Sequence, residues 1–312
     1  MTRLTRKLMI SILTVVLSIS ALGTTTFAWF TLTNVATIEA FDANIISDTG
    51  IEISLDGVNW YSTLTADMIY DVIPENFEFN HVTTSDAKTF LTLDGSTLEP
   101  TTSGYLSIPI YFRSEDVQTI TWTSVSLTGQ QVAWESDVAF TASDGSAVLA
   151  GGSINVDASN AIRIAMIDPL ESLLSPVVYE KPADTGIYYN TVLNDASADL
   201  YNDGDGANGA MNYYFKKTNG LPPQIQTFTT IGSIDGLDGG VDVLQMQETD
   251  EETQTFEFGA GILGVGAVEV DFNAAYGGVM FLNIWFEGFD AEAYDSLLGL
   301  VITLSLAFGE AE

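Results

Sequence analysis

Short segments in which apolar and polar residues alternate recur along this chain, separated by Gly, Asp and Asn residues. Residues 51–55 alternate and end at Asp56-Gly57, and residues 89–93 end at Asp94-Gly95 in the same way. Alternation with a period of two is typical of β-strands, and an Asp-Gly pair commonly forms a tight hairpin turn. We therefore expect an all-β fold, an antiparallel jelly-roll-like β-sandwich that spans residues 47–312.

Some segments have an apolar face that predicts how they contribute to a core. These faces are Ile162, Ile164 and Met166 in 161–166, Met280, Leu282, Ile284 and Phe286 in 279–287, and Ile302, Leu304, Leu306 and Phe308 in 301–308. Arg163 and Trp285 should lie on the opposite faces, with Trp285 nearer the surface or a subunit contact. Asp290 is a suitable N-cap for a short helix over 291–298 that ends at Gly299.

Two other segments predict less regular strands. In 119–127, strict alternation places Ile120 and Trp122 on one side and Val125 and Leu127 on the other. In 105–112, Pro109 cannot donate a ladder hydrogen bond, so we expect an edge strand or a bulge there.

The first 28 residues have the features of a secretory signal peptide. Three basic residues precede an apolar run over 8–22, and Thr26-Phe27-Ala28 offers a cleavage site before Trp29. The alternative is an uncleaved anchor, because the run extended to Phe30 is just long enough to span a bilayer. We expect cleavage between Ala28 and Trp29, and a secreted protein that contacts the membrane only through the signal segment.

Directly after the predicted cleavage site the chain alternates again. The residues that share one side of an extended chain are Phe30, Leu32, Ala36, Ile38 and Ala40. One interpretation is the first strand of the chain's own domain. The other is an N-terminal arm over 29–46 that is donated to a neighbouring subunit. Both make the segment structural.

Charge and cysteine content exclude several classes of function. The chain has 42 acidic and nine basic residues and a net charge of −33, which argues against binding to nucleic acid or to anionic lipid surfaces. There is no cysteine, so disulfides and thiolate chemistry are absent. The only histidine is His81, which excludes HExxH zinc sites and His-based triads. We do not expect an enzyme.

An acidic, Gly-rich stretch over 193–252 predicts an irregular insertion in the sandwich. Within it Asp203, Asp205 and Asn208 place oxygen ligands at a sharp turn, as calcium sites require. An EF-hand loop would need Glu at its twelfth position, where this chain has Tyr214, so a solvated acidic turn is the alternative. Calcium is the one cofactor that we consider. Four tryptophans, at 60, 122, 134 and 285, are candidates for a carbohydrate site or for core packing.

Three stretches resemble the TasA/camelysin family of secreted biofilm matrix proteins. They are the predicted leader junction over 23–31 (GTTTFAWFT), the first predicted hairpin over 51–60 (IEISLDGVNW), and 284–290 (IWFEGFD) with the helix and strand expected after it. The resemblance implies a jelly-roll subunit that polymerises when its N-terminal strand completes the sheet of the next copy. The chain is longer than the better-known members, chiefly through 193–252, and lacks a convincing metalloprotease site.

The sequence thus predicts a structural subunit of an extracellular filament or biofilm fibre, whose partners are copies of itself. The alternatives are a monomeric surface module for adhesion or for carbohydrate or calcium binding, and a secreted hydrolase.

Overall fold

The computed structural model describes residues 36–37, 41–48, 50–75, 77–84, 86–94, 97–136, 139–141, 146–169, 177–180, 230–231, 240–249, 253–263, 267–288 and 300–310. Their elements are β1 (Ala36–Thr37), β2 (Phe41–Ser47), β3 (Ile51–Ser54), β4 (Thr63–Leu64), α3 (Ala66–Val72), β5 (Glu78–Phe79), β6 (His81–Thr84), β7 (Phe90–Asp94), β8 (Thr97–Thr101), β9 (Tyr105–Ser114), β10 (Thr119–Gly129), β11 (Gln131–Glu135), β12 (Phe140–Thr141), β13 (Ala147–Val148), β14 (Ser153–Asp157), the 3₁₀-helix η1 (Ala158–Ala161), β15 (Ile162–Ile167), β16 (Val177–Glu180), β17 (Thr230–Ile231), β18 (Val241–Gln245), β19 (Gln247–Glu248), β20 (Gln254–Glu257), β21 (Ala267–Val270), β22 (Tyr276–Glu287) and β23 (Ile302–Gly309). The predicted leader, calcium loop and 291–298 helix lie outside the described residues.

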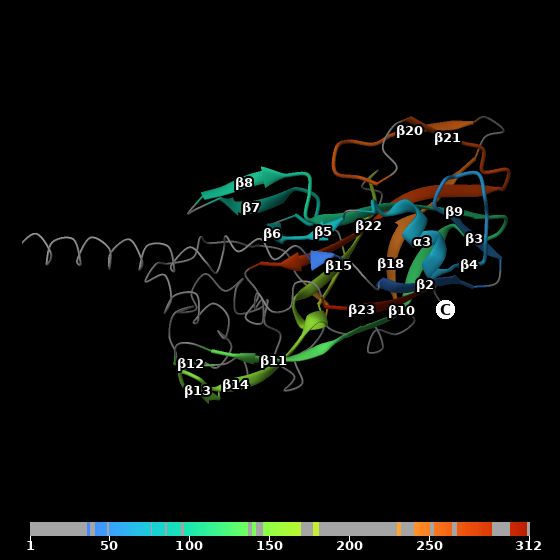
Figure 1. Ribbon diagram of the computed structural model, residues 1–312. Helices are drawn as coiled ribbons and strands as arrows, with labels where there is room; N and C mark the ends of the chain where they lie inside the picture. Colours follow the sequence, from blue (N-terminus) through green and yellow to red (C-terminus); the bar gives the residue numbers. More distant parts are fainter. Residues whose placement is uncertain are drawn as a thin grey trace, which may run out of the picture.

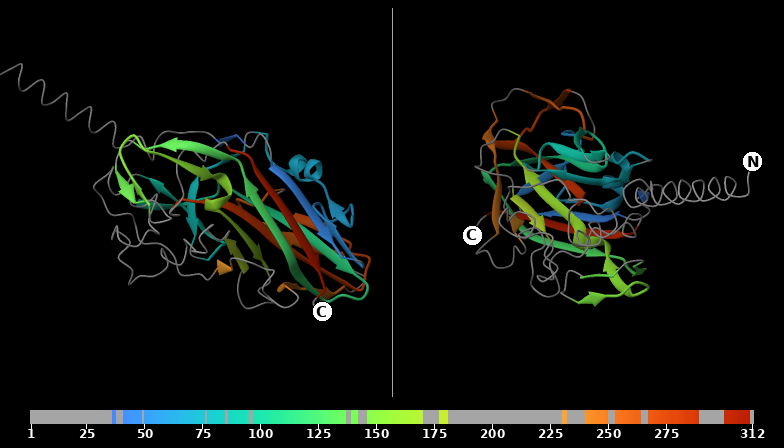
Figure 2. Two further views of the ribbon diagram at one scale, coloured as in Figure 1. Left: turned by 90° about the horizontal axis from the view of Figure 1, so that it is seen from below. Right: turned by 90° about the vertical axis from the view of Figure 1, so that its left-hand side faces the viewer.

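Two curled sheets form a sandwich, which confirms the predicted all-β class. Among the described residues, one sheet has the order β18-β10-β23-β2-β4, and the other is organised around β22, which pairs with β15 on one side and β9 on the other. Figure 1 shows β2, β23 and β10 below β9 and β22, and Figure 2 shows β10, β23 and β2 side by side. The sheets are mixed rather than purely antiparallel, because β2 runs parallel to β23 and β6 runs parallel to β22.

The main core lies between these two layers and contains the apolar faces predicted from the sequence. Ile162, Ile164, Met166, Met280, Leu282, Ile284, Phe286, Ile302, Leu304, Leu306 and Phe308 are all buried in it. The helix α3 adds Ile69 to the same core. The alternation rule therefore identified the inward side of β15, β22 and β23 correctly.

Strand β10 departs from strict alternation. Its register against β23 shifts between Trp122 and Ser124, which is a β-bulge. An extra residue in one strand reverses which side chains face inward. Leu127 is therefore buried in the main core together with Ile120 and Trp122, and the predicted separation of these residues was wrong.

The outer face of the β22 sheet is covered as well. Trp285 was expected nearer the surface but is 0% exposed, in a second cluster with Val82, Ala87, Phe90, Tyr105, Ala165, Ile167 and Val178. A third cluster joins Tyr111, Val270, Phe272 and Val279. Figure 1 shows β7–β8 and β20–β21 above β9 and β22. The β20–β21 hairpin is a separate sheet, whereas β7–β8 continues the curled β22 sheet through β6. Because side chains pack on both sides of the sheet, β22 is buried on both faces and has apolar residues on each of them.

Pro109 lies in β9 opposite Phe281, with no register shift along that pairing. The pairing of β3 with β9 reaches only Tyr111, so no described strand flanks Pro109 on its other side. The expectation of an unpaired edge at Pro109 is thus confirmed locally, although β9 is an inner strand from Tyr111 to Ser114.

Candidate functional site

The structure describes a small part of the predicted assembly arm. Ala36 lies in β1, which pairs with β5 in antiparallel register, Ala36 opposite Phe79 and Thr37 opposite Glu78. Phe30, Leu32, Ile38 and Ala40, the cleavage pair Ala28 and Trp29, and the metal candidates Asp203, Asp205 and Asn208 lie outside the described residues. Of the segment before Phe41, the structure therefore describes the pairing of β1 with β5.

The β1–β5 pair is a short junction beside the sandwich. Each strand has two residues, and the pair is separate from the two main sheets. Its β5 side is well anchored, because Phe79 is 6% exposed in the main core and packs edge-to-face on Phe77 at a ring distance of 5.1 Å. Isolated two-stranded ladders are marginally stable, so β1 adds little to the stability of the chain through its backbone bonds.

The strand that follows is held much more firmly. β2 pairs with β23 in parallel over Phe41 to Ser47 and with β4 on its other side. Ile45 is buried in the main core. Residues 41–46, which the sequence placed with the arm, thus form an inner strand of the chain's own sheet. An exchangeable arm has to end before Phe41.

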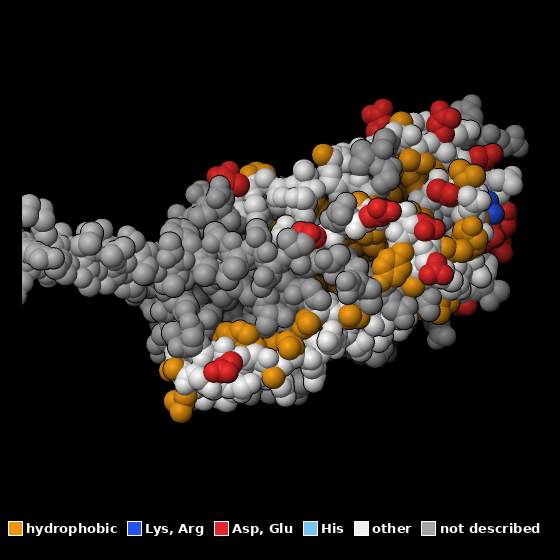
Figure 3. Space-filling model, viewed as in Figure 1, with side chains coloured by type: hydrophobic (Ala, Val, Ile, Leu, Met, Phe, Trp, Pro, Cys, Tyr) orange, Lys and Arg blue, Asp and Glu red, His pale blue; other side chains and the backbone are white. Residues whose placement is uncertain are grey.

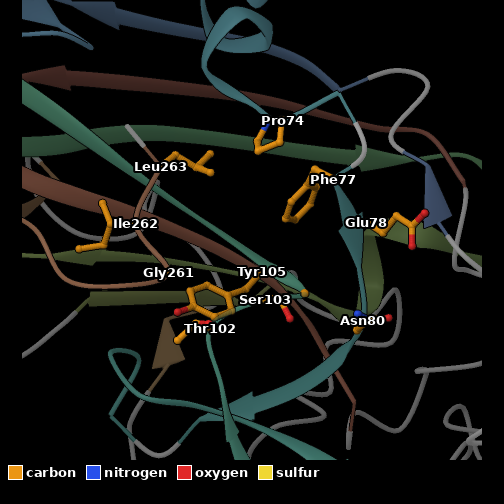
Figure 4. A pocket seen from close by; sticks show the side chains of 11 residues that line it. Pro74, Phe77, Glu78, Asn80, Thr102, Ser103, Tyr105, Gly261, Ile262 and Leu263 are labelled. Carbon is orange, nitrogen blue, oxygen red and sulfur yellow. The ribbon is translucent and has the colours of Figure 1, made fainter. Parts of the chain in front are cut away.

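A cavity of about 380 Å³ lies next to β5. Its walls come from three stretches far apart in sequence, 74–80, 102–105 and 261–263. The Asn80 N–H donates to the Gly104 carbonyl at 3.1 Å, and the Leu263 N–H donates to the Ser107 carbonyl at 2.7 Å. In Figure 4, Phe77 and Leu263 lie on one side of the cavity, and Tyr105 and Thr102 lie on the other. No local sequence pattern predicts this cavity, because tertiary contacts create it.

The four candidate tryptophans, all of them in the described part of the chain, do not form one sugar-binding platform. Trp122 is buried in the main core, as expected, and Trp134 packs against that core. Trp285 is buried in the second cluster, and Trp60 packs against the third. The Arg113 guanidinium lies 4.4 Å from the Trp60 ring centroid and forms a 2.7 Å ion pair with Glu52. The four rings therefore have separate structural roles.

In the part of the chain that the structure describes, acidic side chains are spread over the surface rather than gathered at a metal centre. Figure 3 shows Asp and Glu scattered over the described part of one face, with hydrophobic side chains between them. Within the described ranges, no group of three or more His, Asp or Glu residues is arranged to hold a metal ion. His81 begins β6 and lies opposite Phe286 in β22. None of the helices that the structure describes is long and apolar enough to cross a bilayer.

Comparisons of this chain with family models, with curated proteins and with solved structures gave no match. The class that the fold defines is an all-β sandwich, and the resemblance to the TasA/camelysin family stays a prediction.

Proposed function

We propose that this protein is a secreted subunit of an extracellular fibre, and that it polymerises by donating the arm before Phe41 to the next copy. The observation that carries the proposal is the contrast between the two-residue β1 junction and the seven-residue β2 strand directly after it. An arm joined weakly to its own chain and anchored firmly at its base can be exchanged without loss of the fold.

Exchange conserves the contacts that the chain makes with itself. A neighbour's arm can pair with β5 as β1 does, which is the usual reason that swapping a terminal element is a low-cost route to assembly. In the donated strand, extending the register by one residue beyond Thr37 aligns Ile38 with Phe77. Backbone bonds then supply the joining geometry, and each apolar side chain that becomes buried contributes roughly 1.5–3 kcal/mol.

The high charge makes assembly sensitive to salt. The full chain carries a net charge of −33, so copies of this acidic subunit repel one another, whereas strand pairing and apolar burial do not depend on charge. Added salt screens the repulsion over a Debye length of about 8 Å at 0.15 M. We therefore expect fibres to form faster as ionic strength rises.

Electron microscopy of the purified protein tests the proposal directly. Fibres are expected from the intact mature chain, and deletion of 29–40 should abolish them while a folded β-rich body remains. A synthetic peptide of 29–41 should bind that body. A truncated protein that is unfolded and does not bind the peptide would make the segment an ordinary first strand.

A matched set of substitutions separates the two faces of the arm. Replacing Leu32 and Ile38 with Asp should block fibres, whereas replacing Thr31 and Thr33 with Asp adds the same charge on the other face and should have a small effect. Thr37 is unsuitable as a control because it lies opposite Glu78, where a second acid would be repelled. If both pairs of substitutions reduce fibre formation equally, the arm does not bind its neighbour through a specific apolar face. A folded intact protein without fibres would favour the monomeric surface module.

A further inference from the structure

The cavity beside β5 has a rigid aromatic wall. Tyr105 is 8% exposed, and its ring stacks on Phe90 with centroids 3.8 Å apart and an interplanar angle of 19°. Phe90 in turn packs edge-to-face on Trp285 at 5.5 Å. Because Trp285 and Phe90 are fully buried, the Tyr105 ring is fixed in position before any ligand arrives.

The Tyr105 hydroxyl is a polar group with an unused bonding capacity. It makes no hydrogen bond within the described part of the chain, although the residue is more than nine-tenths buried and lines the cavity. A phenol hydroxyl both donates and accepts, and that of Tyr105 stays in contact with solvent through the cavity, unlike the fully buried hydroxyl of Tyr111, which has no partner among the described residues. Burial also raises the pKa of Tyr105, so the hydroxyl stays neutral at ordinary pH. A bound molecule with a hydroxyl of its own can form a hydrogen bond with it in place of solvent.

The opposite wall approaches this hydroxyl through a glycine. Gly261 has φ +93°, and a Cβ at that position would collide with the Tyr105 hydroxyl oxygen. Gly104 is similar, with φ +86° and an ideal Cβ 2.8 Å from the Cβ of Asn80. Two glycines in left-handed conformations therefore bring the loops close together at this point.

The remaining lining specifies the ligand chemistry. Pro74, Phe77, Ile262 and Leu263 present apolar surface, and Glu78, Asn80, Thr102 and Ser103 present hydrogen-bonding groups. None of the described lining residues is Lys, Arg or His, and the net charge is −33, so an anionic ligand is disfavoured. A neutral ring that has one apolar face and several hydroxyls fits these groups.

We propose that this cavity binds a neutral pyranose unit of a glycan, with Tyr105 and Asn80 bonding its hydroxyls and Phe77 contacting its apolar face. Its volume of about 380 Å³ suits a single ring and lies at the small end of the roughly 300–1,000 Å³ typical of ligand cavities. Among the described lining residues Glu78 is the single carboxylate, whereas glycoside hydrolysis requires a pair. The proposal is therefore for binding and not for cleavage.

Calorimetric titration of the purified protein with cellotriose, maltotriose and N-acetylchitotriose tests the site, with trigalacturonate as the anionic probe. At least one neutral triose should bind. Tyr105→Phe keeps the stacked ring and removes only the hydroxyl, so affinity should fall about 3- to 10-fold, as expected for one hydrogen bond. Tyr61→Phe, which removes an exposed hydroxyl outside the cavity, should bind as the parent does.

Asn80→Ala provides a second, independent loss of a polar contact and should weaken the same triose by a similar factor. Melting temperatures of all variants confirm that the fold is retained. The proposal is overturned if no neutral triose binds at concentrations up to roughly 10 mM, near the weak limit of measurable affinity. It is also overturned if both variants bind like the parent, or if trigalacturonate binds more tightly than the neutral trioses.

Discussion

Replacing Asp86 with Ala should lower the free energy of unfolding by about 0.5–2 kcal/mol, the range found when a side chain that caps backbone N–H groups at a helix N-terminus is lost. The Asp86 carboxylate accepts hydrogen bonds from the N–H groups of Lys88 at 2.9 Å and Thr89 at 2.6 Å, and from the Thr84 hydroxyl at 3.0 Å. These bonds hold Ala87 at φ 58°. A left-handed conformation costs a non-glycine residue about 1–2 kcal/mol, so the turn needs the carboxylate.

The loss can be measured by urea unfolding followed through tryptophan fluorescence. Trp285 lies beneath this turn, in the same cluster as Ala87 and Phe90, so it reports on the region directly. Glu115→Ala is the matched control, because it removes an equal charge from an exposed residue in the connection after β9. If the two variants lose the same free energy, the turn contributes nothing and the reasoning fails.

The same turn predicts a pH dependence. Burial alone would raise the pKa of Asp86, but hydrogen bonds from Thr89, Lys88 and Thr84 outweigh it and hold the pKa below its ordinary value of 3.8. A pKa lowered by folding means that the carboxylate adds stability above pH 3.8 and that this stability is lost as pH falls through the folded-state pKa. The free-energy difference between the parent and Asp86→Asn should therefore be full at pH 7 and disappear in acid.

Three other outcomes are expected. Gly57→Ala should destabilise the fold by about 1–3 kcal/mol in urea unfolding, because φ is +71° and the new Cβ would lie 2.7 Å from the Val270 side chain. Intact mass of the secreted protein should show Trp29 as its first residue, and retention of 1–28 would indicate an anchor. Calcium should raise the melting temperature relative to EDTA, and an equal rise in Asp203→Ala/Asp205→Ala would exclude that loop as the site.

The strands β15, β22 and β23 could be predicted because each has one consistently apolar side. Trp285 shows where that reasoning stopped. β22 carries apolar residues on both faces, including Val279, Phe281 and Trp285, and such a run is typical of a strand covered on both sides. The sequence contained this signal, but the regular apolar face of Met280, Leu282, Ile284 and Phe286 explained the segment by itself, so the second apolar face was not recognised. Two-sided burial depends on hairpins that are distant in sequence, so their position is fixed only by the fold.

The bulge in β10 also left a signal in the sequence. Apolar residues occupy 120 and 122 and then 125 and 127, which changes the phase of the alternation between Trp122 and Val125. A single inserted residue produces that change. The prediction was wrong because it extended one phase across the whole strand.

Turns were predictable only where glycine marks them. Asp56 and Asp86 accept matching sets of backbone hydrogen bonds, each from the residues two and three positions later. The first turn was predicted from Asp56-Gly57. The second has Ala87 at the equivalent position, and alanine is a poor indicator of a left-handed conformation. The cavity beside β5 could not be found at all, since its three walls share no local pattern.

The position of β2 determines how arm exchange can be distinguished from ordinary folding. A deletion that ends at residue 40 removes β1 and leaves β2 paired with both β23 and β4. A deletion that ends at residue 47 removes the inner strand of that sheet and the buried Ile45 with it. If the arm is exchangeable, the first deletion should stop assembly with little loss of stability, whereas the second should unfold the protein. Only the second deletion removes a strand of the sandwich. Loss of fibres after the first deletion, in a protein that stays folded, therefore indicates loss of the arm and not damage to the sandwich.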